Sequence, residues 1–151
     1  MRLRSLRIEN FRSFDDQTIT FDGYTCFVGP NGAGKSTVLN ALNIFFRNSG
    51  ASAIDLLNLS EEDFHRKNTA RPIKITLSFD QLSDEAKEAL KAYVRHDQLV
   101  VSATAEFDQI SQRAPVRQIG ARLVMKHFAD YFRAQENKAK AAELKQIYEV
   151  I

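Results

Sequence analysis

Alternating hydrophobic and polar positions predict four strands along this chain. Residues 73–79 (IKITLSF) alternate strictly, which is typical of a strand with one buried face. Residues 3–8, 18–21 and 99–107 carry the same signal in shorter or less regular form. We expect these four strands to lie side by side as an antiparallel meander.

A different pattern begins at residue 24. Residues 24–28 (YTCFV) are almost continuously apolar, as in a strand covered on both faces, so Cys26 is expected to be a buried structural thiol. A glycine-rich stretch over 29–34 follows, and residues 36–47 then have helical spacing. The apolar stripe predicted for that helix consists of Val38, Leu39, Leu42, Phe45 and Phe46. A buried strand that leads through glycines into a helix predicts a parallel part of the sheet beside the meander.

Helix start signals recur later in the chain. Ser60 and Ser83 each precede acidic residues, as N-caps do. From residue 113 onward the pattern is interpreted as helical, with a possible buried stripe and a stretch over 134–143 rich in Lys, Ala and Glu. We therefore predict an α/β fold with a mixed sheet, a domain over residues 1–112 and a helical segment over 113–151.

Composition and charge narrow the class of protein. The chain has 151 residues, of which 44% are hydrophobic and 26% charged, which is ordinary for a globular domain. Its net charge of +2 is too small to indicate nucleic-acid binding. Four arginines crowd the N-terminus, and we interpret them as a solvated strand face, with a DNA-facing patch as the alternative: Arg2, Arg4, Arg7 and Arg12. A single cysteine excludes an internal disulfide, and no apolar run reaches the length of a membrane span, so we expect a cytoplasmic protein without a membrane partner.

Residues 29–36 (GPNGAGKS) match the phosphate-binding pattern G-x-x-x-x-G-K-[ST]. Glycines let the backbone turn its N–H groups inward, and the following helix directs its positive end at the same place. In such a loop Lys35 reaches the β- and γ-phosphates, Ser36 ligates Mg²⁺, and Thr37 extends the donors toward the α-phosphate. The predicted loop residues that bind nucleotide are Asn31, Gly32, Ala33, Gly34, Lys35, Ser36 and Thr37.

The residues around this loop resemble one branch of the P-loop proteins. Residues 8–14 (IENFRSF) and 27–42 (FVGPNGAGKSTVLNAL) are similar to the N-terminus of SMC/RecF-type ABC ATPases. The resemblance implies ATP and Mg²⁺ as ligands, and a head that forms a homodimer over two ATP molecules. It also implies that Arg12 approaches the nucleotide. A glutamine after the last strand, Gln109 or Gln112, is a candidate contact to Mg²⁺ and water, although a surface position is the simpler interpretation of each.

A second resemblance comes from the later segments. Residues 59–64 (LSEEDF), followed by the strand over 72–79, look most like the OLD (overcoming lysogenization defect) group, to which Gabija-type phage-defence nucleases are related. It implies a C-terminal nuclease domain and DNA as a partner. The alternatives are a RecF/SMC-like repair or chromosome ATPase, and a module that binds nucleotide without hydrolysing it. A P-loop kinase or GTPase is disfavoured, because neither a lid arginine cluster nor an N-K-x-D element is present.

Several motifs of an ABC head are missing from these residues. No apolar strand ends in Asp-Glu, no Ser-Gly-Gly signature occurs, and no switch histidine is recognisable, so we assign no catalytic residue here. His65 and His96 are expected at the surface, too far apart in sequence to suggest a zinc site. We expect the chain to be the first part of a longer polypeptide that binds ATP weakly and hydrolyses little by itself.

Overall fold

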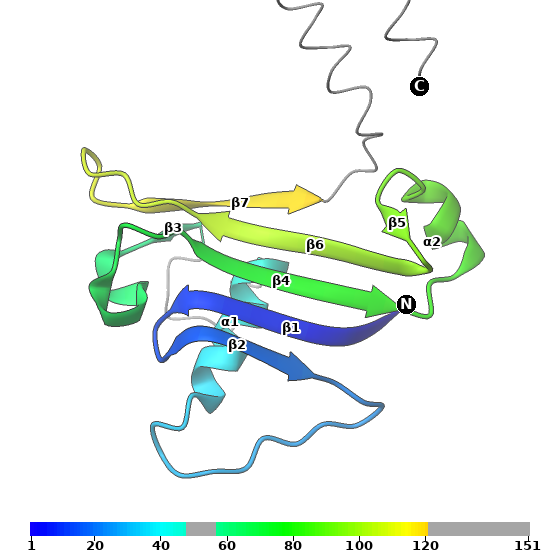
Figure 1. Cartoon of the computed structure of the whole chain (residues 1–151), viewed down its shortest axis with the longest axis horizontal. Coiled ribbons are helices and arrows are strands. Elements are labelled where there is room, and N and C mark those ends of the chain that lie inside the picture. Colours follow the sequence, from blue (N-terminus) through cyan, green and yellow to red (C-terminus); the bar gives the residue numbers. More distant parts are fainter. Residues whose placement is uncertain (48–56, 121–151) are drawn as a thin grey trace, which may run out of the picture. The chain divides into compact units, whose positions relative to one another are not determined.

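A computed structural model describes residues 1–47 and 57–120 of the chain. Its strands form one sheet in the order β2-β1-β4-β6-β7-β3, with β5 paired to β6, and every pair is antiparallel (Figure 1). The elements are β1 (Arg2–Phe11), β2 (Phe14–Thr20), α1 (Lys35–Phe46), β3 (Asn58–Leu59), the 3₁₀ turns η2 (Glu61–Asp63) and η3 (His65–Lys67), β4 (Ile73–Asp80), α2 (Asp84–Ala89), β5 (Val94–Arg95), β6 (Gln98–Ala105) and β7 (Ala114–Gly120).

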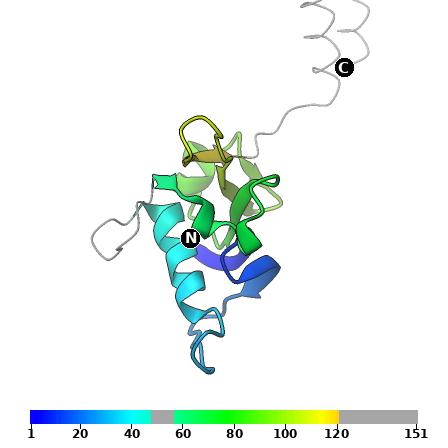
Figure 2. The ribbon, with the colours of Figure 1, turned by 90° about the vertical axis from the view of Figure 1, so that its left-hand side faces the viewer.

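The predicted antiparallel meander is confirmed, and its register explains the core. Leu6 of β1 lies opposite Leu77 of β4, which lies opposite Val101 of β6. Alternate residues of the three strands therefore face the same side of the sheet. Helix α1 packs against this side, where it shares a buried core with β1, β4 and β6 (Figure 2). The largest fully buried side chains of the described residues are Phe11, Phe64, Leu6, Ile8, Ile44, Leu59, Ile73, Ile75 and Leu77.

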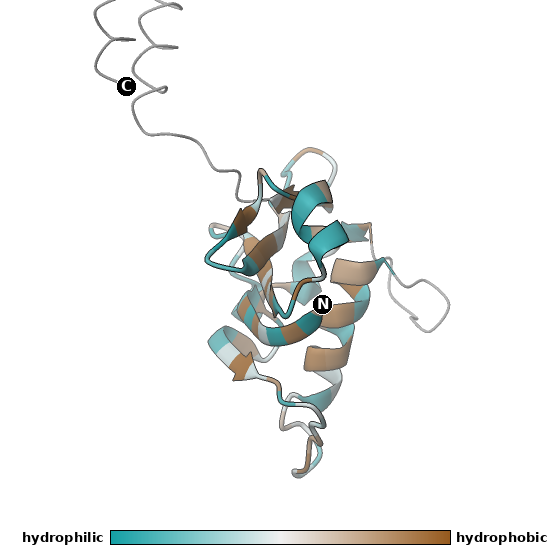
Figure 3. Cartoon of the chain, turned by 90° about the vertical axis from the view of Figure 1, so that its right-hand side faces the viewer, coloured by the Kyte–Doolittle hydropathy of each residue, from teal (hydrophilic) through white to brown (hydrophobic). Residues whose placement is uncertain are grey.

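Helix α1 buries a different face from the one predicted. Its buried residues are Thr37, Val38, Ala41, Ile44 and Phe45. Leu39 and Phe46, assigned to the buried stripe, are 55% and 56% exposed. Apolar residues occur on more than one side of this helix, so spacing alone could not select the side that meets the sheet. Helix α2 is different, since it buries no residue and is mostly hydrophilic (Figure 3).

The strand predicted over residues 24–28 is not formed. Tyr24 and Val28 are 87% and 90% exposed, and Phe27 makes an edge-on contact with Phe21 at 6.2 Å between ring centroids. A strand covered on both faces needs a hydrogen-bonded neighbour and two covering layers, and the described residues provide neither for this segment. The parallel part of the sheet is accordingly not found among them, and the prediction of a buried Cys26 is wrong, because this thiol is exposed.

Residues 114–120 form strand β7 instead of the predicted start of a helix. β7 pairs with β6, with Val116 opposite Ala105 and Ile119 opposite Ser102. Val116 is buried and Ile119 is 53% exposed, so the segment has one buried side, as a strand with a single covered face does. The apolar residues of this segment have helical spacing, but its pairing with β6 makes it a strand. The rest of the predicted helical segment, residues 121–151, lies outside the described residues, as do residues 48–56.

The N-terminal arginines are ion-paired on strand surfaces. Arg2 donates to both carboxylate oxygens of Asp80, and Arg7 does the same to Asp16. These hydrogen bonds lower the pKa of both aspartates. The arrangement favours the solvated strand face over a DNA-facing patch, because much of the positive charge already has a partner. No helix among the described residues is long and apolar enough to cross a lipid bilayer.

The exposure of Cys26 gives a direct test of this structure. Because Cys26 is the only cysteine and its side chain is exposed, Ellman's reagent should react with one thiol per folded chain, at a rate near that of the chain unfolded in guanidinium. A thiol that reacts only after unfolding would show that residues 24–28 are buried after all.

Candidate functional site

The glycine-rich loop over 29–34 depends on two residues in the left-handed backbone region. Gly32 has φ 84° and Gly34 has φ 89°, values that side chains with a Cβ adopt at a cost. Gly34 is also short of space, since a Cβ there would lie 2.6 Å from Cζ of Phe14. The loop is therefore pressed against the first residue of β2 as it enters α1.

The first backbone N–H groups of α1 have no side-chain cap. Its N-cap is Gly34, no side chain caps it, and no acidic residue stands in its first turn. The first backbone N–H groups of a helix have no intrahelical acceptor, and the helix dipole adds positive potential there. Lys35 increases this positive charge at the helix end where a cation is least favourable. Such an end of a helix binds anions, and phosphate in particular.

Lys35 and its neighbours are arranged around the loop. Nζ of Lys35 donates to the carbonyl oxygens of Gly29 and Pro30, at 2.7 and 2.8 Å. Ser36 is exposed, whereas Thr37 is buried and accepts a hydrogen bond of 3.0 Å from the hydroxyl of Ser13. That bond joins the segment after β1 to the first turn of α1.

These elements line an open cavity of about 290 Å³. Its lining residues are Arg12, Ser13, Asn31, Gly32, Gly34, Lys35, Ser36 and Thr37, so the predicted loop residues other than Ala33 come together here with Arg12. The volume is at the lower end of the range for ligand pockets. No acidic residue is among the lining residues.

Arg12 is held by a carboxylate from a distant part of the chain. Its Nε and Nη2 both donate to Oδ1 of Asp63, at 2.9 and 2.7 Å, and its backbone N–H donates to the carbonyl of Asp63 at 2.8 Å. Arg12 has φ 49°, an unusual conformation for a residue with a long side chain. Its side chain is 31% exposed, against 7% for Asp63. The sequence pattern placed Asp63 only among the acidic residues that follow the Ser60 cap, with no role at the site.

The other candidates have mixed outcomes. His65 is half-buried, not a free surface residue, because its Nδ1 lies 2.8 Å from the carbonyl oxygen of Arg12. His96 is exposed, as predicted. Gln109 and Gln112 are exposed in a local turn, where Nε2 of Gln112 donates to the carbonyl of Gln109, and neither lines the cavity at the loop. Within the described part of the chain, no cluster of side chains could hold a metal ion by itself.

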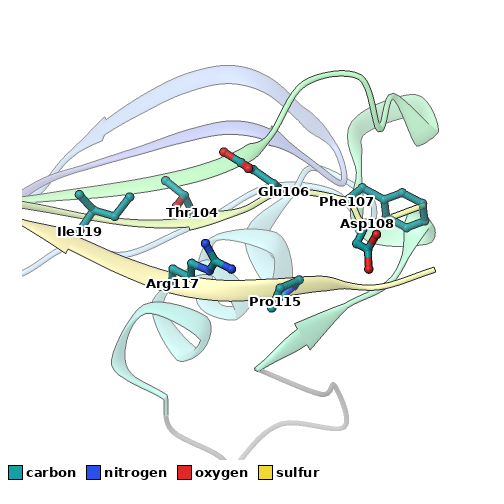
Figure 4. Close-up of a pocket in the computed structure, with 7 residues that line it drawn as sticks. All are labelled: Thr104, Glu106, Phe107, Asp108, Pro115, Arg117 and Ile119. Carbon is teal, nitrogen blue, oxygen red and sulfur yellow. The ribbon is translucent and has the colours of Figure 1, made fainter. Parts of the chain in front are cut away.

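A second cavity of about 440 Å³ lies beside β6 and β7 (Figure 4). It is lined by Thr104, Glu106, Phe107, Asp108, Pro115, Arg117 and Ile119, none of which carries a sequence motif. The Asp108 carboxylate accepts from the backbone N–H groups of Ile110 and Ser111. Hydrogen bonds with Ser111 and these amides lower the pKa of Asp108. Asp108 therefore stabilises a turn, and the cavity lacks the uncapped helix end found at the glycine-rich loop.

Comparison with known proteins identifies the family. The model of a family described as an AAA ATPase domain matches residues 1–151, the whole chain. The chain belongs to this family. The resemblance to OLD and SMC proteins is also confirmed by individual relatives, all of which the chain matches over only part of their length.

The OLD nuclease of Thermus scotoductus is 36% identical over 78 residues, covering 52% of the chain and 14% of that protein. A chromosome partition protein Smc of Lactiplantibacillus plantarum is 34% identical, covering 53% and 7%. The endonuclease GajA of Bacillus cereus is 28% identical, covering 62% and 16%. The chain thus spans about a sixth or less of each of these relatives.

A solved structure has the same fold. It comes from a study of ATP-driven dimerization and DNA-stimulated activation of SMC ATPases, and it superposes with a TM-score of 0.53 at 18% identity. The superposition covers 82% of this chain and 73% of the other. The predicted α/β P-loop NTPase fold is confirmed.

The two strained glycines allow a paired test of the loop. Gly32→Ala should cost about 1–2 kcal/mol of unfolding free energy from backbone strain alone, because nothing lies within 4 Å of its Cβ position. Gly34→Ala should cost about 1–3 kcal/mol more, since its Cβ also meets Phe14. Urea unfolding of both variants measures the difference. Equal losses would mean that Phe14 does not press on the loop.

Proposed function

We propose that the loop over 29–36 and the start of α1 bind ATP with Mg²⁺. The observation that carries this proposal is the meeting of Lys35, Ser36, Arg12 and an uncapped helix N-terminus around one cavity. Two cationic side chains and a helix N-terminus, with no carboxylate among the lining residues, suit a polyphosphate. Membership of an ATPase domain family supports ATP as the nucleotide.

Each residue has a role in this proposal. The two carbonyl oxygens that accept from Lys35 hold its ammonium beside the loop, and oxygens of the β- and γ-phosphates would take their place. The exposed hydroxyl of Ser36 would ligate Mg²⁺, which neutralises the negative charge of the phosphate oxygens when bound. Asn31, Gly32, Ala33 and Gly34 would offer backbone N–H groups, with Thr37 behind them.

The activity of the whole protein is a wider proposal. The cavity has no acidic lining residue that could orient water, so we propose that hydrolysis requires carboxylates from outside residues 1–151. We propose that paired heads close over ATP and regulate a DNA-processing activity in the cytoplasm. The similarity to a protein named for nuclease activity and to an endonuclease supports an OLD-like nuclease.

Similarity to chromosome partition proteins supports the alternative, an SMC-like chromosome or RecF-like repair ATPase. A further alternative is a regulatory module that binds nucleotide without turnover, which the absence of an acidic lining residue favours.

Replacing Lys35 with Ala should reduce the affinity for MgATP at least tenfold, because a charge-assisted contact to phosphate is lost. The fold should persist, since the hydrogen bonds of the Lys35 ammonium within the described residues go to two loop carbonyls. Calorimetric titration measures the affinity, and circular dichroism checks the fold. Lys74→Ala, at an exposed position on β4, is the matched control. Equal affinity in Lys35→Ala and the parent chain would contradict the proposed site.

The isolated chain should release phosphate from ATP no faster than its Lys35→Ala variant. Phosphoryl transfer needs a positioned water and stabilised charge, and this cavity offers only the phosphate-binding part. A phosphate-release assay with and without DNA measures this. Clear turnover that disappears in Lys35→Ala would show that a catalytic carboxylate lies within residues 1–151.

A further inference from the structure

The segment over residues 60–65 holds Arg12 through both its backbone and its side chain. Oδ1 of Asp63 accepts from two nitrogens of the guanidinium, and the Asp63 carbonyl accepts from the Arg12 N–H. On the other side, Nδ1 of His65 lies 2.8 Å from the Arg12 carbonyl oxygen. A neighbouring bridge pairs Phe11 with Phe64. The backbone N–H and carbonyl of Arg12 therefore both have partners in this segment, as do Nε and Nη2 of its side chain.

Asp63 is itself immobilised. Its second oxygen, Oδ2, accepts from the backbone N–H and the hydroxyl of Ser60, at 3.0 and 3.2 Å. The residue is only 5% exposed, so water does not compete strongly for these bonds. Phe64 is 2% exposed and packs edge-on against Phe107, with 5.7 Å between ring centroids. The carboxylate thus has a fixed direction before any ligand binds.

Asp63 holds Arg12 at the cavity beside the phosphate-binding loop. Arg12 lines the cavity together with Lys35 and Ser36. Its Nε and Nη2 are occupied by Asp63, whereas Nη1 makes no hydrogen bond within the described residues. The guanidinium edge with Nε and Nη2 is therefore used for orientation, and the N–H groups of Nη1 remain to donate to a ligand. The left-handed backbone of Arg12 is the kind of strained conformation that persists only where its surroundings impose it.

We propose that Asp63, fixed by Ser60, is the positioning residue that orients Arg12 toward bound nucleotide. This inference rests on the proposed ATP site and adds to it a residue 51 positions away in sequence from the arginine that it orients. Orientation before binding spares the entropy of ordering a long side chain, so the effect of Asp63 should appear in nucleotide affinity. It should act only through Arg12.

A matched ion pair serves as the control. Arg7 donates through Nε and Nη2 to Asp16 in a similar fork, but both side chains are about half exposed and neither lines the cavity. Asp16→Asn removes the same kind of charge from the β1–β2 pair. It should leave nucleotide affinity unchanged.

The test is a double-mutant cycle on MgATP affinity by calorimetry. Arg12→Ala and Asp63→Asn should each weaken binding about tenfold, the size expected for a charge-assisted hydrogen bond. The double variant should bind no more weakly than Arg12→Ala alone. Urea unfolding of each variant records the loss of stability separately.

Three results would overturn the proposal. Asp63→Asn could bind MgATP as the parent does, Arg12→Ala could do so, or Asp63→Asn could weaken binding equally in the Arg12→Ala background. The last result would mean that Asp63 only maintains the fold of the site. If Asp63→Asn does not fold, Ser60→Ala, which removes one bond to Oδ2, decides the question in the same cycle with a smaller loss. Failure of the ATP site itself is recognised separately, by unchanged affinity in Lys35→Ala.

Discussion

Burial of one face of the β1–β4–β6 sheet against α1 is the constraint on which the rest of this structure depends. Leu6, Leu77 and Val101 stand in one cross-strand row, and the apolar side of α1 packs into the same core. This packing brings the end of β1 next to the start of α1, where Ser13 bonds to Thr37. The phosphate-binding loop and Arg12 lie together because β1 ends where α1 begins.

Two of the non-glycine residues with positive φ lie where β1 ends. Asn10 and Arg12 have φ values of 55° and 49°, and both are held by residues that follow β3. The buried Asn10 side chain donates to the carbonyls of Asn68 and Arg71, and Arg12 bonds to Asp63. Strained residues near a candidate site are expected when the fold specifies a side-chain direction that ordinary backbone geometry would not give.

The loop was predictable from the sequence because its chemistry is local. Glycines at 32 and 34, a lysine, and a hydroxyl at the start of a helix lie within a few residues of one another, so their spacing specifies the geometry. The alternation over 73–79 predicted β4 for the same reason. The apolar run over 24–28 was misinterpreted, since an apolar pattern indicates what a segment could bury and not whether a partner covers it.

The sequence by itself determined the family, the phosphate-binding loop and the four strands of the meander, all of which depend on neighbouring residues. Tertiary structure alone decided which side of α1 is buried, that residues 114–120 pair with β6, and that Arg12 is bonded to Asp63. These outcomes depend on contacts with other segments, 11 positions away for Ala105 and Val116 and 51 for Arg12 and Asp63. A local pattern does not specify the partner of a helix face, a strand edge or a guanidinium.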